Sequence, residues 1–363
     1  MIQRFYFLCL LLLSTAALFA QEPRKLIRGY NLQTENDVFA GLLGFKNEDK
    51  DYSGGFKFEF YTDRLKNGIF PFFKNRKELR KEDDYFNFNS IYLQGMGFTP
   101  NREAFAASTP VRDQRPYASV FGIGRRRVAV FEPSDISVES DLFIGKVGTK
   151  IPGQFQNFLH GYVTNSDKVQ GWNNQIANGG RWVANYRVRA NINLLRLVHR
   201  GDSSKITFFA EPHISVGNLF VNYGLGLSLG DRPAASQGLM GPMGSNNLNV
   251  LSDNGDRYEK GFWSHFDWQL YAKYQRVQHN TLLMGMPFQD ESIYTIHSED
   301  INKNVFDIGA KIIFHYYPDY RSFNGKTRST AVYLELIHRS KEFSYHQSHI
   351  FSSIGVTVFL LGK

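Results

Sequence analysis

Apolar and polar residues alternate along many stretches of the chain, with a period of two positions. In residues 56–60, phenylalanine fills every second position, and a lysine and a glutamate lie between. Residues 182–193 alternate in the same way over a longer stretch. Further stretches with this pattern are residues 262–274, 307–315, 332–336 and 350–360. Such alternation places different side chains on the two faces of a β-strand, so the pattern predicts an all-β protein.

The polar faces of these strands decide between two kinds of β protein. A soluble β-sandwich has the same alternation. Here, however, charged residues such as Arg187 and Arg189 lie deep inside a long predicted strand. A polar lumen within a lipid-facing exterior explains such charges better than a soluble core does. Because a bilayer tolerates no open sheet edge, we predict a closed antiparallel transmembrane β-barrel.

The chain has room for about twelve such strands, an even number that suits a bacterial barrel. The predicted strands are residues 26–38, 52–63, 85–98, 116–130, 136–147, 180–197, 204–217, 221–230, 260–276, 304–317, 328–341 and 348–360. With both termini in the periplasm, the connections near 39–51, 99–115 and 148–179 point outward. The third of these contains an apolar stretch at residues 155–163, which predicts a short helix in an extracellular loop.

The first residues have the features of an export signal. Arg4 precedes a short apolar run, and small residues lead to a plausible cut after Ala20. The run is too short for a spanning helix, although an uncleaved anchor is the alternative. We therefore expect residues 1–20 to be a cleaved signal peptide and residues 21–363 to form one barrel domain in the bacterial outer membrane. Cys9 is the only cysteine, so the mature chain has no disulfide.

Charge points to an anionic partner. The formal net charge is +8, which suits nucleic acid or a phosphate-rich membrane surface. No nucleic-acid-binding motif is found, and an exported protein rarely meets nucleic acid. Phosphorylated glycolipid is therefore the favoured partner, and we expect a monomer embedded in the membrane.

Residues suited to hydrolysis gather at the predicted outward rim. Asn36 and Asp37 end the first strand, Ser53 begins the second, and His160 lies in the third outward loop. The predicted order of strands and outward loops alone brings an amide, a carboxylate, a hydroxyl and an imidazole to one rim. This set is suited to hydrolysis assisted by a hard cation.

Short motifs in a fixed order extend this pattern over the chain. They are Glu35-Asn36-Asp37 with Phe39, Asp51-Tyr52-Ser53-Gly54-Gly55, Asp113-Gln114-Arg115-Pro116-Tyr117-Ala118, Gln156-Asn157 with His160, Gly171-Trp172 with Gln175, and Gly217-Asn218-Leu219-Phe220. In these motifs the chain resembles the outer-membrane lipid A deacylases that remove the 3'-linked acyloxyacyl group. The resemblance covers essentially the whole mature chain. It implies a twelve-stranded barrel with its site between the wall and a helix in an extracellular loop.

The resemblance also implies residue roles. His160 would be the general base that activates water, because a neutral imidazole accepts a proton near neutral pH. Asn36 and Asp37 would hold the site and a Ca²⁺ ion, which prefers oxygen ligands. Ser53 would take the place of a threonine or serine and orient the water or the ester. The implied substrate is the lipid A of lipopolysaccharide in the outer leaflet.

Three positions depart from the family pattern. Phe105 stands where the family has a functional lysine, and Arg102 or Arg112 could supply that charge instead. Ser119 replaces a glycine, and Ile176 follows Gln175 where a glutamate is usual. The sequence therefore leaves open the acyl-chain and positional specificity, the full set of Ca²⁺ ligands and the substitute for the lysine.

Each of these residues also has a simpler interpretation. Asn36 and Asp37 could be turn formers, Ser53 a small polar residue before two glycines, and His160 a solvated loop residue. Two other functions remain open on these grounds. One is an esterase or phospholipase with a serine nucleophile, for which no clear Ser–His spacing is present. The other is a non-enzymatic barrel, either porin-like or lipid-binding, although side chains can fill a twelve-stranded lumen.

Two further motifs have structural interpretations. Arg115-Pro116-Tyr117 suits the start of a strand, with Tyr117 as an anchor at the membrane interface. The basic run Arg125-Arg126-Arg127 could bind phosphate, but we expect it to line the lumen and form ion pairs there.

Overall fold

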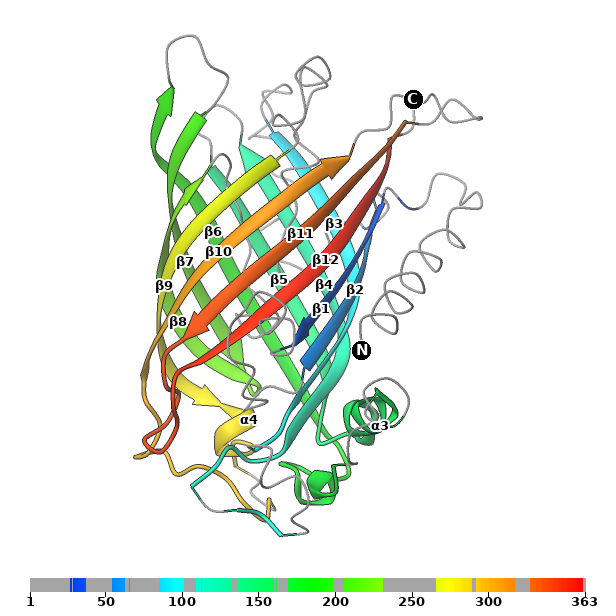
Figure 1. Cartoon of the computed structure of the whole chain (residues 1–363), viewed down its shortest axis with the longest axis vertical. Helices are drawn as coiled ribbons and strands as arrows, with labels where there is room; N and C mark the ends of the chain where they lie inside the picture. Colours follow the sequence, from blue (N-terminus) through cyan, green and yellow to red (C-terminus); the bar gives the residue numbers. More distant parts are fainter. Residues whose placement is uncertain are drawn as a thin grey trace.

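The structure, a computed structural model, describes residues 27, 29–36, 54–62, 65, 85–100, 109–111, 113–131, 136–159, 161, 169–198, 205–230, 266–288, 292–316 and 327–361. Its strands are β1 (Gly29–Asn36), β2 (Gly54–Tyr61), β3 (Tyr85–Phe98), β4 (Ala118–Phe131), β5 (Ile136–Val147), β6 (Arg181–Val198), β7 (Lys205–Gly217), β8 (Phe220–Gly230), β9 (Phe266–Asn280), β10 (Asn304–Tyr316), β11 (Thr327–Arg339) and β12 (His349–Leu361). Each strand pairs with its neighbour in the chain, and β1 pairs with β12 to close the barrel (Figure 1). The predicted fold class, a closed antiparallel barrel of twelve strands, is confirmed.

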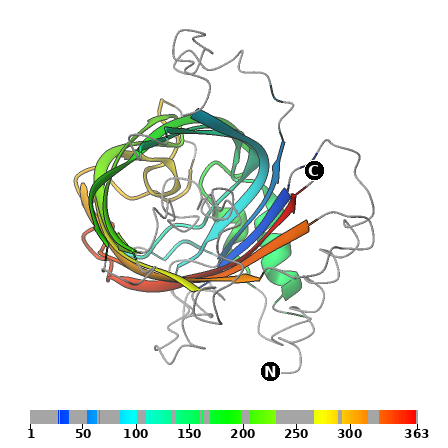
Figure 2. The same ribbon diagram turned by 90° about the horizontal axis from the view of Figure 1, so that it is seen from above.

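The two faces of the wall differ as the alternation predicts. On β2, Lys57 and Glu59 point into the lumen and are fully buried, whereas Phe58 between them lies on the outer face. On β6, Trp182 is 66% exposed while Arg187 is 2% exposed. Figure 2, a view along the barrel, shows the single ring of strands that separates these two environments. Lys57, Glu59 and Arg187 therefore face the inside of the ring, whereas Phe58 and Trp182 face outward.

Ion pairs fill the middle of the lumen. Arg187 lies 2.7 Å from Glu139 and 3.2 Å from Asp141, and Arg189 lies 2.8 Å from Glu139. The Tyr92 hydroxyl donates to Asp141 over 2.6 Å. Because buried charges are costly unless they are paired, this network stabilises a lumen that apolar side chains do not fill.

The basic run on β4 is split by the strand geometry. Arg126 points into the lumen and forms an ion pair with Glu59. Its neighbours Arg125 and Arg127 have the opposite orientation, because side chains alternate along a strand. The prediction that the whole run lines the lumen is therefore wrong for two of the three arginines.

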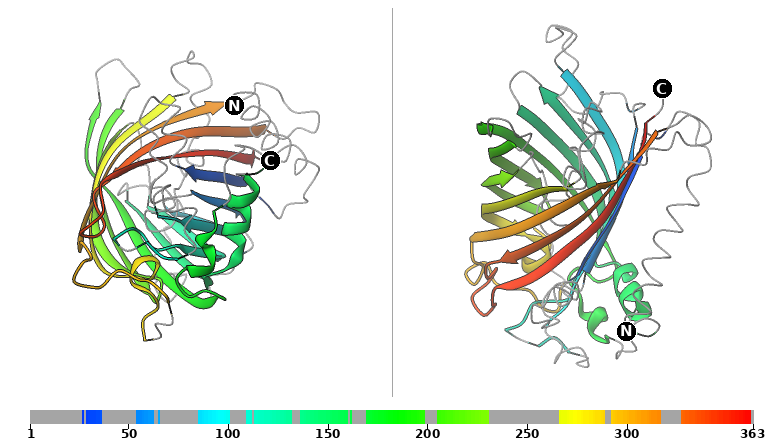
Figure 3. Two further views of the ribbon diagram at one scale, coloured as in Figure 1. Left: turned by 60° about the horizontal axis from the view of Figure 1, so that its bottom comes forward. Right: turned by 45° about the horizontal axis from the view of Figure 1, so that its top comes forward.

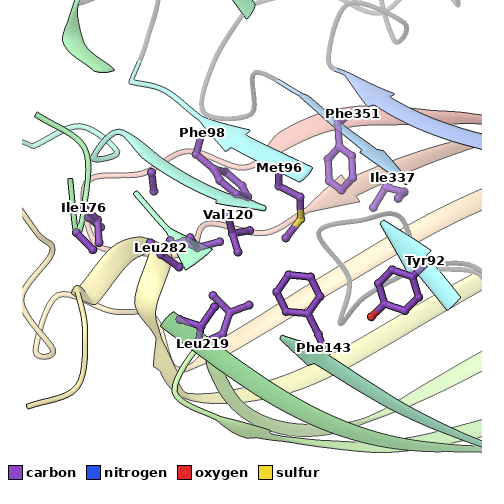
Figure 4. Packing of buried hydrophobic residues seen from close by; sticks show 14 of the residues in the cluster. Tyr92, Met96, Phe98, Val120, Phe143, Ile176, Leu219, Leu282, Ile337 and Phe351 are labelled. Atoms are coloured by element: carbon purple, nitrogen blue, oxygen red, sulfur yellow. The ribbon is translucent and has the colours of Figure 1, made fainter. Parts of the chain in front are cut away.

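Apolar side chains close one end of the lumen. The buried cluster includes Met96, Phe98, Val120, Phe143, Ile176, Leu219, Leu282, Ile337 and Phe351, and Figure 4 shows these side chains converging from strands and loops. The cluster lies where β3 ends and β4 begins, beyond the charged network. In the part of the chain that the structure describes, the lumen is thus occupied by its own side chains, as the small size of the barrel predicts.

Short helices lie at the end of the barrel that this cluster closes, hereafter the helical rim (bottom of Figure 1). They are α3 (Lys150–Leu159), the 3-10 helix η6 (Gly171–Asn174) and α4 (Thr281–Met284). No helix among the described residues is long and apolar enough to cross a membrane. The predicted signal peptide, residues 1–20, lies outside the described residues.

The predicted extracellular helix exists but is displaced. We predicted it at residues 155–163, and α3 begins five residues earlier at Lys150. The first turn contains Pro152, which is tolerated there because the first amide groups of a helix have no partner within it. The next residue is Gly153, and a side chain here would collide with an indole ring, because a Cβ atom at this position would be 2.7 Å from Trp172. Residues that usually end helices thus begin this one.

A buried ion pair joins two loops across the helical rim. Arg115, just before β4, lies 2.5 Å from Glu342, which follows β11. Arg339 is 3.8 Å from the same carboxylate. Burial would raise the pKa of the Glu342 carboxyl, but the charges of Arg115 and Arg339 outweigh burial and hold that pKa well below its usual range.

The depressed pKa of Glu342 predicts a loss of stability in acid. The ion pair makes its full contribution to the free energy of unfolding above the ordinary glutamate pKa of about 4.3. This contribution falls as the pH drops below that value. We expect the free energy of unfolding in detergent micelles, followed by tryptophan fluorescence, to decrease progressively as the pH falls below about 5. The Arg115→Met/Glu342→Gln double variant, which lacks the pair, should decrease less. Parallel curves for the two proteins would contradict this account.

Candidate functional site

Only one of the four predicted site residues can be placed. Asn36 is the last residue of β1, while Asp37, Ser53 and His160 lie outside the described residues. Glu35, its neighbour in the motif, points into the lumen, is 1% exposed and accepts a hydrogen bond from Gln33 over 3.0 Å. Because side chains alternate along a strand, Asn36 points to the outer face of the wall. The Asn36 side chain is therefore on the membrane side of the barrel wall.

Gly54 lies directly beside Asn36 on the outer face. A Cβ atom on Gly54 would be 3.1 Å from Nδ2 of Asn36 and 3.0 Å from the carbonyl oxygen of Glu35. The φ angle of Gly54 is +135°, a conformation that other residues rarely adopt. The chain can thus begin β2 close to the end of β1 only with glycine here.

The next strand carries a second glycine in the same row. Gly97 on β3 pairs with Gly54. A Cβ atom on Gly97 would be 3.2 Å from the ring of Trp172 and 3.6 Å from Pro152 of α3. Both side chains belong to the loop between β5 and β6, which therefore packs on the outer face of β3. Figure 3 shows α3 outside the ring of strands at this rim. We call Asn36, Gly54, Gly97, Pro152 and Trp172 the rim site.

Hydrogen bonds within this loop hold α3 in position. The Trp172 indole donates to Gln156 over 2.9 Å. The Asn157 side chain accepts from the Val169 amide over 2.8 Å and donates to the Val169 carbonyl over 3.2 Å. The Gln156-Asn157 and Gly171-Trp172 motifs therefore fix the helix that directly precedes His160 in the chain.

Tyr117 packs against Trp172 of this loop. Its ring contacts Trp172 edge-on with 5.5 Å between centroids, and the residue is 4% exposed. Burial raises the pKa of Tyr117 to about 12. Our prediction that Tyr117 anchors at the membrane interface is therefore wrong, although the structural role predicted for its motif is confirmed.

The departure at Ser119 also has a structural explanation. The Ser119 hydroxyl lies 2.9 Å from the Thr149 carbonyl and 2.7 Å from the side-chain oxygen of Gln175. Gln175 also donates to the Thr149 carbonyl over 3.4 Å. A serine in place of glycine thus gives the wall an additional polar contact with both ends of the loop that carries α3.

Aromatic side chains continue the outer face toward the middle of the wall. Phe56 and Phe121 have ring centroids 6.2 Å apart. They meet above Gly95, where a Cβ atom would be 2.6 Å from the Phe56 ring. The rim site therefore has a polar residue, Asn36, at the end of the wall and apolar rings on the membrane side, which is the arrangement an amphipathic lipid would need.

The donor atoms near Asn36 are of the type that calcium prefers. Asn36 offers an amide oxygen, and Asp37 offers a carboxylate at the next position in the chain. Among the described residues, no group of three or more His, Cys, Asp or Glu side chains could hold a metal ion. The chemistry of the donor set fits a hard cation, and further ligands would have to come from other groups.

Comparison with known proteins identifies the family. The profile of the family described as outer membrane protein LpxR matches residues 5–360. The chain belongs to the LpxR family. The family resemblance of the sequence motifs is thereby confirmed, and the protein belongs to a family of outer-membrane proteins.

A solved member of the LpxR family has the same fold. LpxR from Salmonella typhimurium is 16% identical, with a TM-score of 0.63, over 91% of this chain and 99% of that one. The β domain of the Bordetella autotransporter BrkA is 10% identical, with a TM-score of 0.38, over 92% of this chain and 98% of that one. A comparison with curated protein sequences gives no match.

Sequence reasoning did not single out Gly97, and it quoted Gly54 and Trp172 within motifs without assigning them a role in packing. Gly97 and Gly54 carry no functional group, so a search for chemistry passes over them. Trp172 was noticed as part of a motif, but its contact with Gly97 depends on a loop folding back on the wall. A useful signal would have been glycine at the outward-facing position next to the end of a predicted strand.

The close packing at Gly97 predicts a graded loss of activity. Gly97→Ala requires Trp172 to move by only a few tenths of an ångström, because its Cβ would lie 3.2 Å from the ring. Gly97→Leu would push Trp172 and α3 off the wall. We expect little effect of alanine and at least a tenfold loss of lipid hydrolysis with leucine, while the barrel still folds. Equal activity of the two folded variants would contradict a role for this packing.

Proposed function

We propose that this protein is a calcium-dependent lipid A 3'-O-deacylase that acts in the outer leaflet of the outer membrane. The observation that carries the proposal is the position of Asn36 on the outer face of the wall, beside Gly54 and in the same row as Gly97, on which the loop that carries α3 packs. An ester in a membrane lipid reaches that face, whereas a soluble substrate in the lumen does not. Membership of the LpxR family supports the same conclusion.

The proposed reaction is hydrolysis of one ester bond. His160 takes a proton from water, and the water oxygen bonds to the ester carbonyl carbon. The bond from that carbon to the 3'-oxygen of the sugar then breaks, and the proton passes from His160 to this oxygen. The products are the free acyloxyacyl acid and a sugar with a free 3'-hydroxyl group. Ser53 would orient the water or the ester.

Asn36 and Asp37 would hold the calcium ion through their side-chain oxygens. When bound, the ion would supply positive charge to the ester oxygen that becomes negative during the reaction. Asn36 would also help to place the ester against the wall, because it projects from the end of β1 toward the membrane. An Asp37→Asn variant keeps an oxygen donor but loses the charge, so we expect it to need more calcium for the same activity.

Three activities measured on one folded sample test the proposal against its alternatives. The protein is reconstituted with lipid A or with phospholipid, and the released acyl groups are measured by mass spectrometry; ion conductance is measured in planar bilayers. We expect release from lipid A, at most slow release from phospholipid, and no steady conductance, because side chains occupy the lumen. Faster turnover of phospholipid would favour a phospholipase, and steady conductance without hydrolysis would favour a porin.

A further inference from the structure

A row of outward-facing residues crosses the wall beside the rim site. Strand pairing places Phe56 next to Gly95, Gly95 next to Phe121, Phe121 next to Lys146, and Lys146 next to Trp182. Rows of paired residues run across the strands, and barrel strands tilt by about 35–45° from the membrane normal. A single row therefore passes through different depths of the membrane.

The chemistry changes along this row. At one end, the rings of Phe56 and Phe121 meet and present an apolar surface. At the other end, Lys146 and Trp182 lie one residue from the ends of β5 and β6 at the helical rim, and Trp182 is 66% exposed. The row thus leads from a surface suited to acyl chains to one suited to the headgroup region.

Lys146 is held in place on the outer face. Its ammonium nitrogen lies 4.7 Å from the centroid of the Trp182 ring. Its stem passes Gly180, where a Cβ atom would be only 3.5 Å from Cδ of Lys146. Gly180 has a φ angle of +90°, so the chain turns back into β6 here and leaves room for the stem.

No described carboxylate neutralises the charge of Lys146, so a bound anion could do so. Within the described ranges of the chain, no carboxylate forms an ion pair with it, and its ammonium group makes a cation–π contact with the neutral indole ring of Trp182. A lysine on the lipid-facing wall is costly toward the middle of the membrane and tolerated near the interface, where its ammonium reaches polar groups. The anions at this level of a membrane are lipid phosphates.

We propose that Lys146 and Trp182 form a subsite for the phosphate and adjoining sugar of a phosphorylated glycolipid in the outer leaflet. The proposal rests on the proposed function in taking this lipid to be the lipid A that reaches the rim site. Lys146 binds the phosphate as a charge-assisted partner. The exposed face of Trp182 packs against the sugar ring, and the acyl chains lie along Phe121 and Phe56. A phospholipid offers the phosphate but no sugar.

Binding without turnover tests this subsite separately from the reaction. Purified protein in detergent micelles is mixed with diphosphorylated lipid A or with its dephosphorylated form, in the presence of a calcium chelator, and bound lipid is measured by native mass spectrometry. We expect Lys146→Met to weaken binding of the phosphorylated form about five- to tenfold and to leave the dephosphorylated form unchanged. Lys146→Arg should retain most of the affinity.

The matched control is Lys303→Met, which removes an exposed lysine before β10 on another part of the helical rim. We expect it to bind both lipids as the wild-type protein does. Wild-type protein that binds both forms equally, or a Lys146→Met variant that binds the phosphorylated form normally, would overturn the subsite. Failure of deacylation with calcium would instead count against the proposed function and leave this binding result intact.

Discussion

The His160→Ala variant is expected to lose hydrolysis of lipid A by about 100- to 10,000-fold, the range for loss of a positioned general base. His160 directly follows α3, which hydrogen bonds from Gln156 and Asn157 hold against the rest of its loop. The loop in turn packs on Gly97, in the row that includes Asn36. α3, which ends one residue before His160 in the chain, therefore lies in a loop that packs at the rim where β1 ends.

The matched control for this prediction is His297→Ala. His297 is an exposed histidine in the loop that follows α4 at the same rim. We expect the control to keep its activity and both variants to fold, as judged by their migration on gels before and after heating. If folded His160→Ala keeps activity within a factor of a few of wild type, His160 is not the general base. It would then be a solvated loop residue.

The largest expected effect on stability is that of Arg115→Met. The substitution leaves Glu342, which is 5% exposed, without its nearest cation. Removing one partner of a buried ion pair typically costs about 3–5 kcal/mol, because the remaining charge stays buried. Arg115 also stacks on Phe98 of the apolar cluster, with its guanidinium carbon 4.3 Å from the ring centroid. We therefore expect a marked decrease in the free energy of unfolding measured with denaturant.

A double-mutant cycle separates the charge from the packing. Glu342→Gln in the Arg115→Met background removes the uncompensated carboxylate, so part of the lost stability should return. If the double variant is as unstable as the sum of the two single variants, the residues do not interact as an ion pair. In that case the cost would come from lost packing against Phe98.

The strands could be predicted because the two sides of a membrane barrel wall differ so strongly. All twelve predicted strands occur, and most end within three residues of the predicted positions. The exception is β9, predicted to end at residue 276 and observed to continue to Asn280. Its last residues lie at the rim and pair with the start of β8 past an irregularity at Val221 and Asn222, so hydropathy no longer marks the strand.

The loops could be predicted only in part. A helix in the third outward loop was expected from its apolar residues, but its start at Lys150 was not, because Pro152 and Gly153 are usually signs of a helix end. Contacts between loops, such as that of Arg115 with Glu342, join residues far apart in the chain, and no local pattern indicates them. The roles of Asp37, Ser53 and His160 stay predictions, since the described residues include only Asn36 of this set.

The most direct test of the account is mass spectrometry of lipid A after incubation with the purified, folded protein, with calcium and with chelator. The account predicts loss of the 3'-linked acyloxyacyl group in calcium, no loss with chelator, and recovery when calcium is added back. Unchanged lipid A in calcium, or loss of an acyl group from another position, would contradict it.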